Sequence, residues 1–334
     1  MKSFESLFLD FVGNRNALQQ LSVDIAAGRF PHALLIEGPA GSGKKTLARL
    51  VAGAAVCADA DHRPCGICAA CRKAADGVHP DITEITGGSG DRSFHIDAIR
   101  ALRNTAYVLP NEADCRVLIL CDAHTMTPQA QNALLKILEE PPRHLRFILT
   151  CENRAQLLST IRSRTAVISL GGVEWEEALP LLRQRLPDVN EQTLHRAFIV
   201  SGGVIGKVLS GLASDTLDKI LELTPALAEA LIAPAEWTFL SLTARLDKDK
   251  EAVTGVLSGL QLIFRDALVL HYGGTATLST APECAATMAA RLSGARLTAL
   301  LREIDYLRQA QLYNMNQTLL LTQISTRLRG AAMG

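Results

Sequence analysis

The sequence predicts an α/β domain built on a parallel sheet, followed by a helical half. Over residues 1–170, short apolar runs alternate with helical patterns, which is typical of a parallel sheet covered by helices on both faces. After Gly171-Gly172 the pattern is helical almost throughout. We therefore expect three parts: an α/β domain over residues 1–170, a small helical unit over 171–212, and an all-α domain over 213–334.

The elements of the first part can be placed individually. Strands are expected at residues 33–36, 82–86, 117–121, 147–149 and 166–170. Helical patterns cover residues 44–58, 96–107 and 128–140, and the second has apolar residues on one face: Ile96, Ile99 and Leu102. The third begins with Pro128 and stops before Pro141-Pro142, where proline favours a start and an end.

The second half is predicted to be a set of amphipathic helices. Helical patterns cover residues 217–232, 252–270 and 297–328, the last with a break near Asn314. In the helix expected over residues 252–270, four apolar residues lie on one face and form a stripe: Leu257, Leu260, Ile263 and Phe264. We expect this stripe to form internal core, with an oligomerisation face as the alternative.

Composition limits the classes of function. The 334 residues carry 34 basic and 34 acidic side chains, so a basic nucleic-acid-binding tail is not expected. Aromatic residues make up 4% of the chain, too few for broad base-stacking platforms. The first residues do not resemble a signal peptide, and each apolar run is shorter than the ~20 residues of a membrane span. We expect a cytoplasmic protein without membrane contact.

A glycine-rich loop lies between the first strand and the next helix. Its sequence, GPAGSGK, has the spacing of a phosphate-binding loop, whose backbone N–H groups converge on phosphate oxygens: Gly38, Gly41, Gly43 and Lys44. The next position normally holds a Ser or Thr that binds magnesium, but here it is Lys45, which is a donor only. Thr46 carries a hydroxyl, but one residue along a helix turns it ~100° away. The loop is therefore compatible with binding of ATP or ADP, but ATP hydrolysis is not expected.

The acidic motif that accompanies such a loop is incomplete. Two successive acids usually follow the strand, one for the metal and one for the attacking water. Only Asp122 is present, flanked by Cys121 and Ala123. Asp122 is therefore a candidate residue of the nucleotide site. The alternative is that it only ends the strand and binds no ligand.

Four of the eight cysteines are closely spaced. Cys57, Cys65, Cys68 and Cys71 form C-x7-C-x2-C-x2-C. Four thiolates suit a closed tetrahedral zinc site, so we expect a structural zinc module at residues 57–71, with free thiols as the alternative. The separated cysteines are expected to be buried small apolar residues: Cys115, Cys121, Cys151 and Cys284.

Three further motifs carry a family resemblance. They are the segment TPQAQNALLKILEEPP over residues 127–142, the segment IRSRT over 161–165, and His79-Pro80-Asp81. With the loop and the cysteines, they resemble the bacterial clamp-loader AAA+ family, and the last resembles its delta-prime branch. The resemblance is specific over residues 1–170, and beyond residue 210 it rests on length and helical character.

The resemblance implies an AAA+ domain with an inserted zinc module, a helical lid and an oligomerisation collar. It also implies a ring that contains gamma/tau-type motor subunits and a delta subunit, and that loads a sliding clamp on primed DNA. Arg164 matches the arginine that completes the ATP site of a neighbour, where such a group is worth ~10³–10⁵ in rate. Thr165 departs from the cysteine usual in that motif.

The same resemblance distinguishes motor from non-motor members. Ile205 aligns with the lid arginine of motor subunits, so three catalytic elements differ, at Lys45, at Cys121/Ala123 and at Ile205. We therefore expect a non-motor subunit that donates Arg164. The alternatives are a divergent ATP-hydrolysing motor and an unrelated zinc-bearing nucleic-acid-binding module.

Overall fold

The structure is a computed structural model that describes residues 11–26, 29–87, 94, 99, 102, 105–312 and 315–333. The chain forms two compact units, Met1–Leu181 and Leu182–Gly334. The first contains a sheet and the second is helical. Each unit is described by itself.

The sheet of the first unit has five strands in the order β2-β3-β4-β1-β5, and every pairing is parallel. The expected parallel α/β fold is confirmed, and each strand lies where the apolar runs predicted one. The strands are β1 (Ala33–Glu37), β2 (Ile82–Thr86), β3 (Arg116–Cys121), β4 (Leu145–Cys151) and β5 (Ala166–Ser169). All of them point the same way, so their carboxyl ends share one edge.

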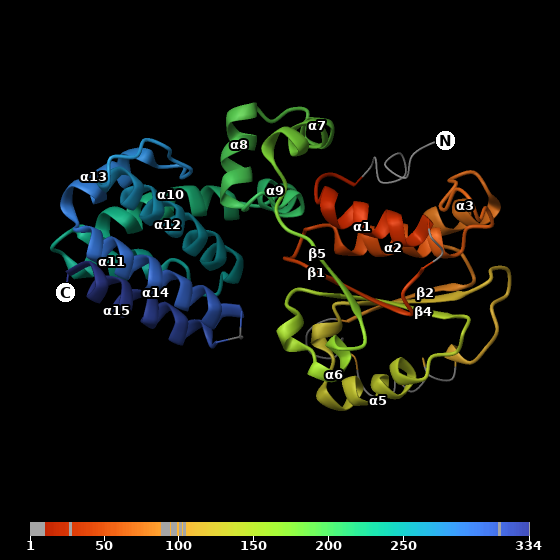
Figure 1. Cartoon of the computed structure of the whole chain (residues 1–334). Helices are drawn as coiled ribbons and strands as arrows, with labels where there is room; N and C mark the ends of the chain where they lie inside the picture. The colour runs from red at the N-terminus through yellow and green to blue at the C-terminus, as the bar shows by residue number, and fades with distance from the viewer. Residues whose placement is uncertain are drawn as a thin grey trace. The chain divides into compact units, whose positions relative to one another are not determined.

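Alternating side chains divide the core of this unit into two layers. In β1, Leu34 and Ile36 pack toward α1 (Arg15–Ala26) and α2 (Lys44–Ala55), while Leu35 packs toward α5 (Pro128–Glu139). Figure 1 shows α1 and α2 on one face of the sheet and α5 with α6 (Ser159–Arg162) on the other. Burial on both faces explains why the central strands β1 and β3 are almost continuously apolar, whereas the edge strands β2 and β5 are more polar and more exposed.

The helices of the first unit follow local signals. At the start of α5 the Thr127 hydroxyl accepts from the Ala130 N–H, and Pro128 occupies the first turn. The helix expected over residues 44–58 ends earlier, at Ala55, because the chain turns at Val56 and brings Cys57 toward the other cysteines. The remaining elements are α3 (Ala69–Ala75), α7 (Trp175–Arg185), η3 (Ala123–Thr125) and η4 (Arg154–Gln156).

The helix expected at residues 96–107 lies largely outside the described residues. Two of its predicted core residues are described, and both are buried: Ile99 and Leu102. They belong to the core layer on the α5 side of the sheet.

The second unit is a helical assembly. The expected helices are present as α10 (Thr216–Ile232), α12 (Lys250–His271), α14 (Gly294–Leu312) and α15 (Gln317–Met333). The predicted break at Asn314 lies outside the described residues. Shorter helices complete the unit: α8 (Glu191–Val200), α9 (Ile205–Leu212), α11 (Glu236–Ala244) and α13 (Pro282–Arg291).

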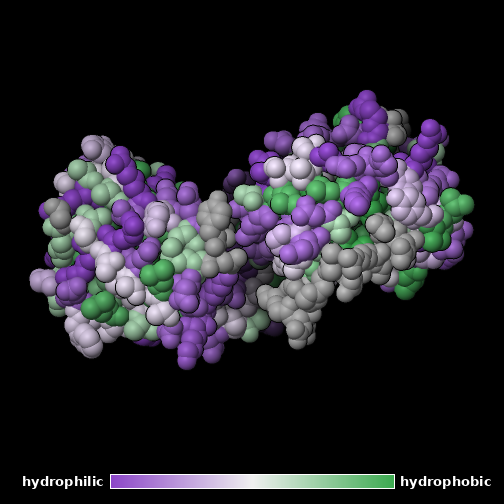
Figure 2. Space-filling model, turned by 90° about the horizontal axis from the view of Figure 1, so that it is seen from below, coloured by the Kyte–Doolittle hydropathy of each residue, from purple (hydrophilic) through white to green (hydrophobic). Residues whose placement is uncertain are grey.

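Helix α12 is the centre of this unit. It contacts α10, α13 and α14, and the predicted stripe is fully internal: Leu257, Leu260, Ile263 and Phe264. By length and composition α12 is apolar enough to cross a membrane, but 56% of its most apolar window is buried inside the unit. On the face drawn in Figure 2 the helical unit shows hydrophobic residues in small groups among polar ones. These observations confirm the core interpretation of the stripe.

Candidate functional site

A cavity of about 590 Å³ opens at the carboxyl edge of the sheet. One wall is the glycine-rich loop with the start of α2: Ala40, Gly41, Gly43, Lys44, Lys45 and Thr46. The opposite wall follows β2, β3 and β4: Gly87, Asp122, His124, Thr125 and Glu152. This is the edge at which ligands bind in open α/β sheets.

The loop has the backbone shape of a phosphate cradle. Gly41 and Gly43 have φ values of +80° and +86°, in the left-handed region that favours glycine. A Cβ at Gly43 would lie 2.8 Å from Phe11 Cε2, and one at Gly38 would lie 2.6 Å from the Leu170 carbonyl oxygen. Among the described residues no side chain caps the first turn of α2, so its N–H groups are available at the cavity.

Lys44 is folded back onto its own loop. Its Nζ donates to the carbonyl oxygens of Gly38 at 2.7 Å and Pro39 at 2.8 Å, and the residue is 6% exposed. Burial lowers the pKa of the Lys44 ammonium, and the negative charges of Glu152 and Asp122 partly offset that shift. The ammonium group therefore lies in the cavity wall, within reach of an anion.

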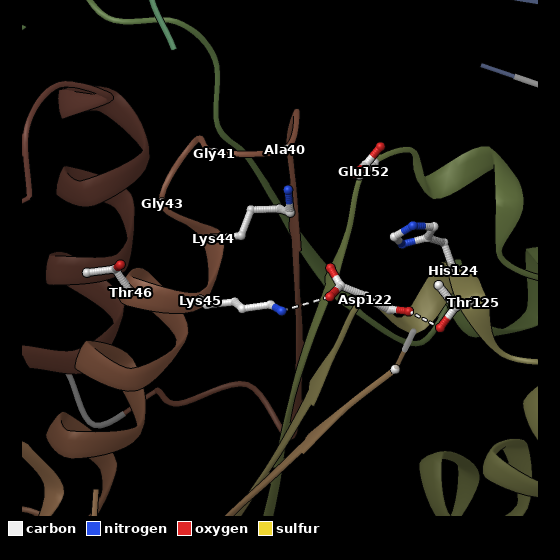
Figure 3. A pocket seen from close by; sticks show the side chains of 11 residues that line it. Ala40, Gly41, Gly43, Lys44, Lys45, Thr46, Asp122, His124, Thr125 and Glu152 are labelled. Atoms are coloured by element: carbon white, nitrogen blue, oxygen red, sulfur yellow. Dashed lines mark hydrogen bonds and ion pairs between the residues drawn. The ribbon is translucent and has the colours of Figure 1, made fainter. Parts of the chain in front are cut away.

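Lys45 forms an ion pair with the single acid of the incomplete motif. Its Nζ lies 2.8 Å from Asp122 Oδ2, across the cavity from the first turn of α2 (Figure 3). Desolvation would lower the pKa of Lys45, but the hydrogen bond and charge of Asp122 outweigh it, so the pKa is raised. Asp122 adopts a left-handed conformation at φ 59°, and its N–H donates to Thr150 Oγ1 at 2.9 Å.

The residues present do not fit a magnesium ion at this place. The carboxylate that would orient the metal is bonded to an ammonium group, which repels a cation. Thr46, whose hydroxyl is next to position 45 in the sequence, lies on another side of α2 from Asp122 (Figure 3). Cys121 and Ala123, the neighbours of Asp122, are fully buried and carry no carboxylate.

Two titratable residues of the wall opposite the loop were not predicted as site residues. Glu152 follows β4, and its negative charge acts on Lys44. His124 follows β3, and its Nδ1 is buried without a hydrogen-bond partner among the described residues. Burial lowers the pKa of His124, which favours the neutral imidazole. Their position directly after buried strands was the signal that could have identified them.

The four predicted metal ligands meet at one point. The sulfur atoms of Cys57, Cys65, Cys68 and Cys71 all lie within 4.8 Å of one another. The Cys65 and Cys71 sulfurs lie 4.0 Å apart. A tetrahedral zinc with Zn–S bonds near 2.3 Å places its sulfurs about 3.8 Å apart, so the cluster needs little contraction to bind one.

The local backbone prepares these sulfurs for negative charge. Backbone N–H groups donate to the sulfurs of Cys57, Cys65 and Cys68, each at 3.3 Å. Desolvation would raise the pKa of Cys68, but hydrogen bonds from the Cys71 and Ala58 backbone outweigh it and lower the pKa to about 6. Burial raises the pKa of Cys71 well above its usual range when no metal is bound. The separated cysteines are buried free thiols, as expected: Cys115, Cys121, Cys151 and Cys284.

Arg164 follows α6 and precedes β5, and it is not among the residues that line the cavity. Its Nη2 lies 2.9 Å from Glu139 Oε1 at the end of α5, and its Nη1 donates to the Thr160 carbonyl at 3.1 Å. The side chain is 35% exposed. The Thr165 hydroxyl donates to the Arg162 carbonyl at 3.2 Å, so threonine closes this turn where the family motif has cysteine.

Two family models match the chain. The model described as the delta subunit of DNA polymerase III matches residues 13–174, and the model of the delta C-terminal region matches residues 216–329. DNA polymerase III subunit delta' of Escherichia coli is 29% identical over 318 residues, which cover 94% of this chain and 93% of that protein. The chain belongs to the DNA polymerase III clamp-loader family.

The chain is also similar to another DNA polymerase III subunit and to several solved structures. A gamma/tau subunit of Mycobacterium tuberculosis is 40% identical over 161 residues, which are 47% of this chain and 27% of that protein. Among solved structures, a gamma subunit-related protein of Thermotoga maritima is 20% identical, covers 94% of this chain and 99% of its own, and has a TM-score of 0.43. RuvB of the same organism is 17% identical, with 87% and 86% covered and a TM-score of 0.44.

The motif that resembled the delta-prime branch of the clamp-loader family has a structural role. The Asp81 carboxylate is fully buried and accepts backbone N–H groups of Asn111 at 2.6 Å, Glu112 at 2.8 Å and Ala113 at 3.0 Å. His79 Nδ1 accepts from the Asp81 N–H at 3.1 Å. The motif therefore fixes the loop that leads into β3, next to the cysteine module.

Proposed function

We propose that this chain is the non-motor, delta-prime-type subunit of a clamp loader and that it donates Arg164 to the ATP site of a neighbouring gamma/tau-type subunit. The observation that supports this most directly is the difference between two ion pairs. Asp122 of the chain's own site is neutralised internally by Lys45, at 2.8 Å. Arg164 is partly exposed and lies outside that site.

A guanidinium offered across an interface stabilises the charge that develops on a transferred phosphoryl group. Arg164 suits this role because its planar fork can form two parallel bonds to phosphate oxygens. Its present partner is one half-exposed carboxylate, and such pairs contribute about 0–1 kcal/mol. A polyphosphate with several negative charges can therefore draw the guanidinium away from Glu139.

The proposal includes the assembly expected from the sequence. The partners are gamma/tau-type motors and a delta subunit, and the complex acts on a sliding clamp and primed DNA in the cytoplasm. The four-cysteine module at residues 57–71 would hold a structural zinc. A closed set of four thiolates leaves no coordination position for catalysis, so the metal would serve the fold.

Arg164→Ala tests the proposal in a reconstituted loader. The complex should assemble normally by gel filtration. ATP turnover at the neighbouring site should fall by a factor approaching the ~10³ typical of arginine fingers. Arg164→Lys should restore little, because a lysine keeps the charge without the fork.

Arg162→Ala is the matched control, since Arg162 is an exposed arginine of the same motif two residues earlier. It should leave turnover near wild type. Unchanged turnover in Arg164→Ala would remove the proposed role. ATP hydrolysis by the isolated wild-type chain, if abolished by Lys44→Ala, would favour a divergent motor instead.

A further inference from the structure

The incomplete nucleotide site keeps its anion-binding half. The loop glycines are in their left-handed conformations, the first turn of the 12-residue α2 is uncapped by described side chains, and Lys44 lies in the wall. These groups recognise phosphate oxygens and do not require a metal. The cavity of about 590 Å³ is large enough for a phosphate chain with part of a nucleoside.

The cation-binding half is altered rather than lost. In the motif, Mg²⁺ bridges the phosphates and the acidic strand end. Here the Lys45 ammonium contacts Asp122 Oδ2 at 2.8 Å and also lines the cavity. An ammonium group has three N–H donors, so a single bond to Asp122 leaves donors that can reach a phosphate oxygen.

We infer that this cavity binds the phosphates of a magnesium-free nucleoside polyphosphate or inorganic diphosphate, with the Lys45 ammonium bridging Asp122 and the phosphate in place of the metal ion. The site then selects against the magnesium complex of the same ligand. A metal-bound phosphate chain would bring a divalent cation against the Lys45 ammonium, and Asp122 is already paired.

This selectivity follows from the charges facing the cavity. Lys44 and Lys45 supply two positive charges, and Asp122 and Glu152 supply two negative ones. His124 is half-buried, and desolvation favours its neutral form. The wall is therefore close to neutral as a whole, but both lysines belong to the first turn of α2, beside the helix N-terminus where phosphates bind.

The inference concerns a different site from Arg164 and stands or fails separately from the proposed function. It is tested by isothermal titration of the full chain with ADP and, in a second arm, with inorganic diphosphate. Each ligand is used with EDTA and with excess Mg²⁺. Wild type should bind in EDTA, and Mg²⁺ should weaken apparent binding by at least about tenfold, the value of one charge-assisted contact.

The two arms identify the source of the phosphate. Comparable binding of both ligands would mean that the cavity recognises the diphosphate group alone. Tighter binding of ADP would mean that the nucleoside also contacts the wall. Either result supports the inference.

Two variants of the same residue make the test specific. Lys45→Thr removes the ammonium and restores the usual hydroxyl, so its preference should reverse, with tighter binding in Mg²⁺ than in EDTA. Lys45→Met removes the ammonium without a metal ligand and should lose about tenfold in EDTA with no gain in Mg²⁺. Lys136→Thr, an exposed lysine of α5, is the matched control and should behave as wild type.

Equal thermal unfolding of the variants would show that they fold. Tighter wild-type binding with Mg²⁺ would overturn the inference. So would absence of binding of both ligands in EDTA, or a Lys45→Thr variant whose metal preference is the same as wild type.

Discussion

Asp81 provides the sharpest test of how the first unit is held together. Its fully buried carboxylate accepts three backbone N–H groups, from Asn111, Glu112 and Ala113, at 2.6–3.0 Å. Asp81→Asn keeps the shape but replaces one oxygen by an NH₂ group, which faces N–H donors and cannot accept from them. One to two charge-assisted bonds of about 1.5–3 kcal/mol each are lost, so we expect a destabilisation of about 2–4 kcal/mol.

The assay is urea unfolding of the full chain followed by circular dichroism, with hydrogen exchange of the loop before β3 to localise the effect. The midpoint should fall without a change in slope, and the amides of residues 111–113 should lose protection. Asp114→Asn is the control, because that side chain is 94% exposed, and it should cost less than about 0.5 kcal/mol. A change below about 0.5 kcal/mol for Asp81→Asn would refute the anchoring role.

The same group predicts a pH dependence. Desolvation would raise the pKa of Asp81, but the hydrogen bonds from Asn111, Glu112 and Ala113 outweigh it, so the folded-state pKa is lowered. A lowered carboxyl pKa contributes stability above the ordinary value of about 3.9 and loses it as the pH falls through the folded value. The stability gap between wild type and Asp81→Asn should stay constant from neutral pH down to about 5 and narrow only below about 4.

Two further predictions concern the other sites. Cys68→Ala should abolish the zinc content of about one per chain and lower the thermal midpoint of the first unit, measured by metal analysis and calorimetry. The reason is that binding energy at a structural site is folding energy. Cys284→Ala, a buried cysteine of the second unit, should keep its metal, and a zinc-free wild type would reject the site. Glu139→Gln weakens a half-exposed pair worth about 0.2–1 kcal/mol, so it should free Arg164 and raise turnover of the assembled loader by up to about fivefold. Glu140→Gln is the control, and reduced turnover in Glu139→Gln would contradict this role for the pair.

The parts of the fold that could be predicted are those in which burial gives the sequence a clear apolar pattern. Strands buried on both faces are continuously apolar, so β1 and β3 stood out from their flanking sequence. Helix ends were harder to place. The helix after the loop stops at Ala55 rather than at residue 58, because the chain turns there and brings Cys57 to the other three cysteines of the cluster. Short α11 and α13 carry no long periodic pattern and were not predicted.

In the candidate site, residues that belong to sequence motifs could be predicted, and residues that are brought together only by the tertiary fold could not. Lys44, Lys45 and the four cysteines lie in fixed-spacing motifs, and spacing alone indicated their chemistry. The partner of Lys45 could not be deduced that way, because the pair with Asp122 depends on how α2 sits over β3. Glu152 was missed for the same reason, since its place in the cavity comes from the order of the strands.

The proposed donation of Arg164 to a neighbour requires that the two ion pairs of this chain differ in what they face. The Lys45–Asp122 pair joins the first turn of α2 to the residue that follows β3, and both residues line the same cavity. A metal ion could bind Asp122 only by displacing the Lys45 ammonium from its carboxylate. The Arg164–Glu139 pair lies at the ends of two helices, with 35% and 46% of its side chains exposed, where water screens the attraction. A polyphosphate from outside can exchange with one carboxylate there at little cost. The two pairs thus differ chiefly in where they lie: the Lys45–Asp122 pair, with 41% and 24% of its side chains exposed, faces the chain's own cavity, and the Arg164–Glu139 pair lies outside that cavity.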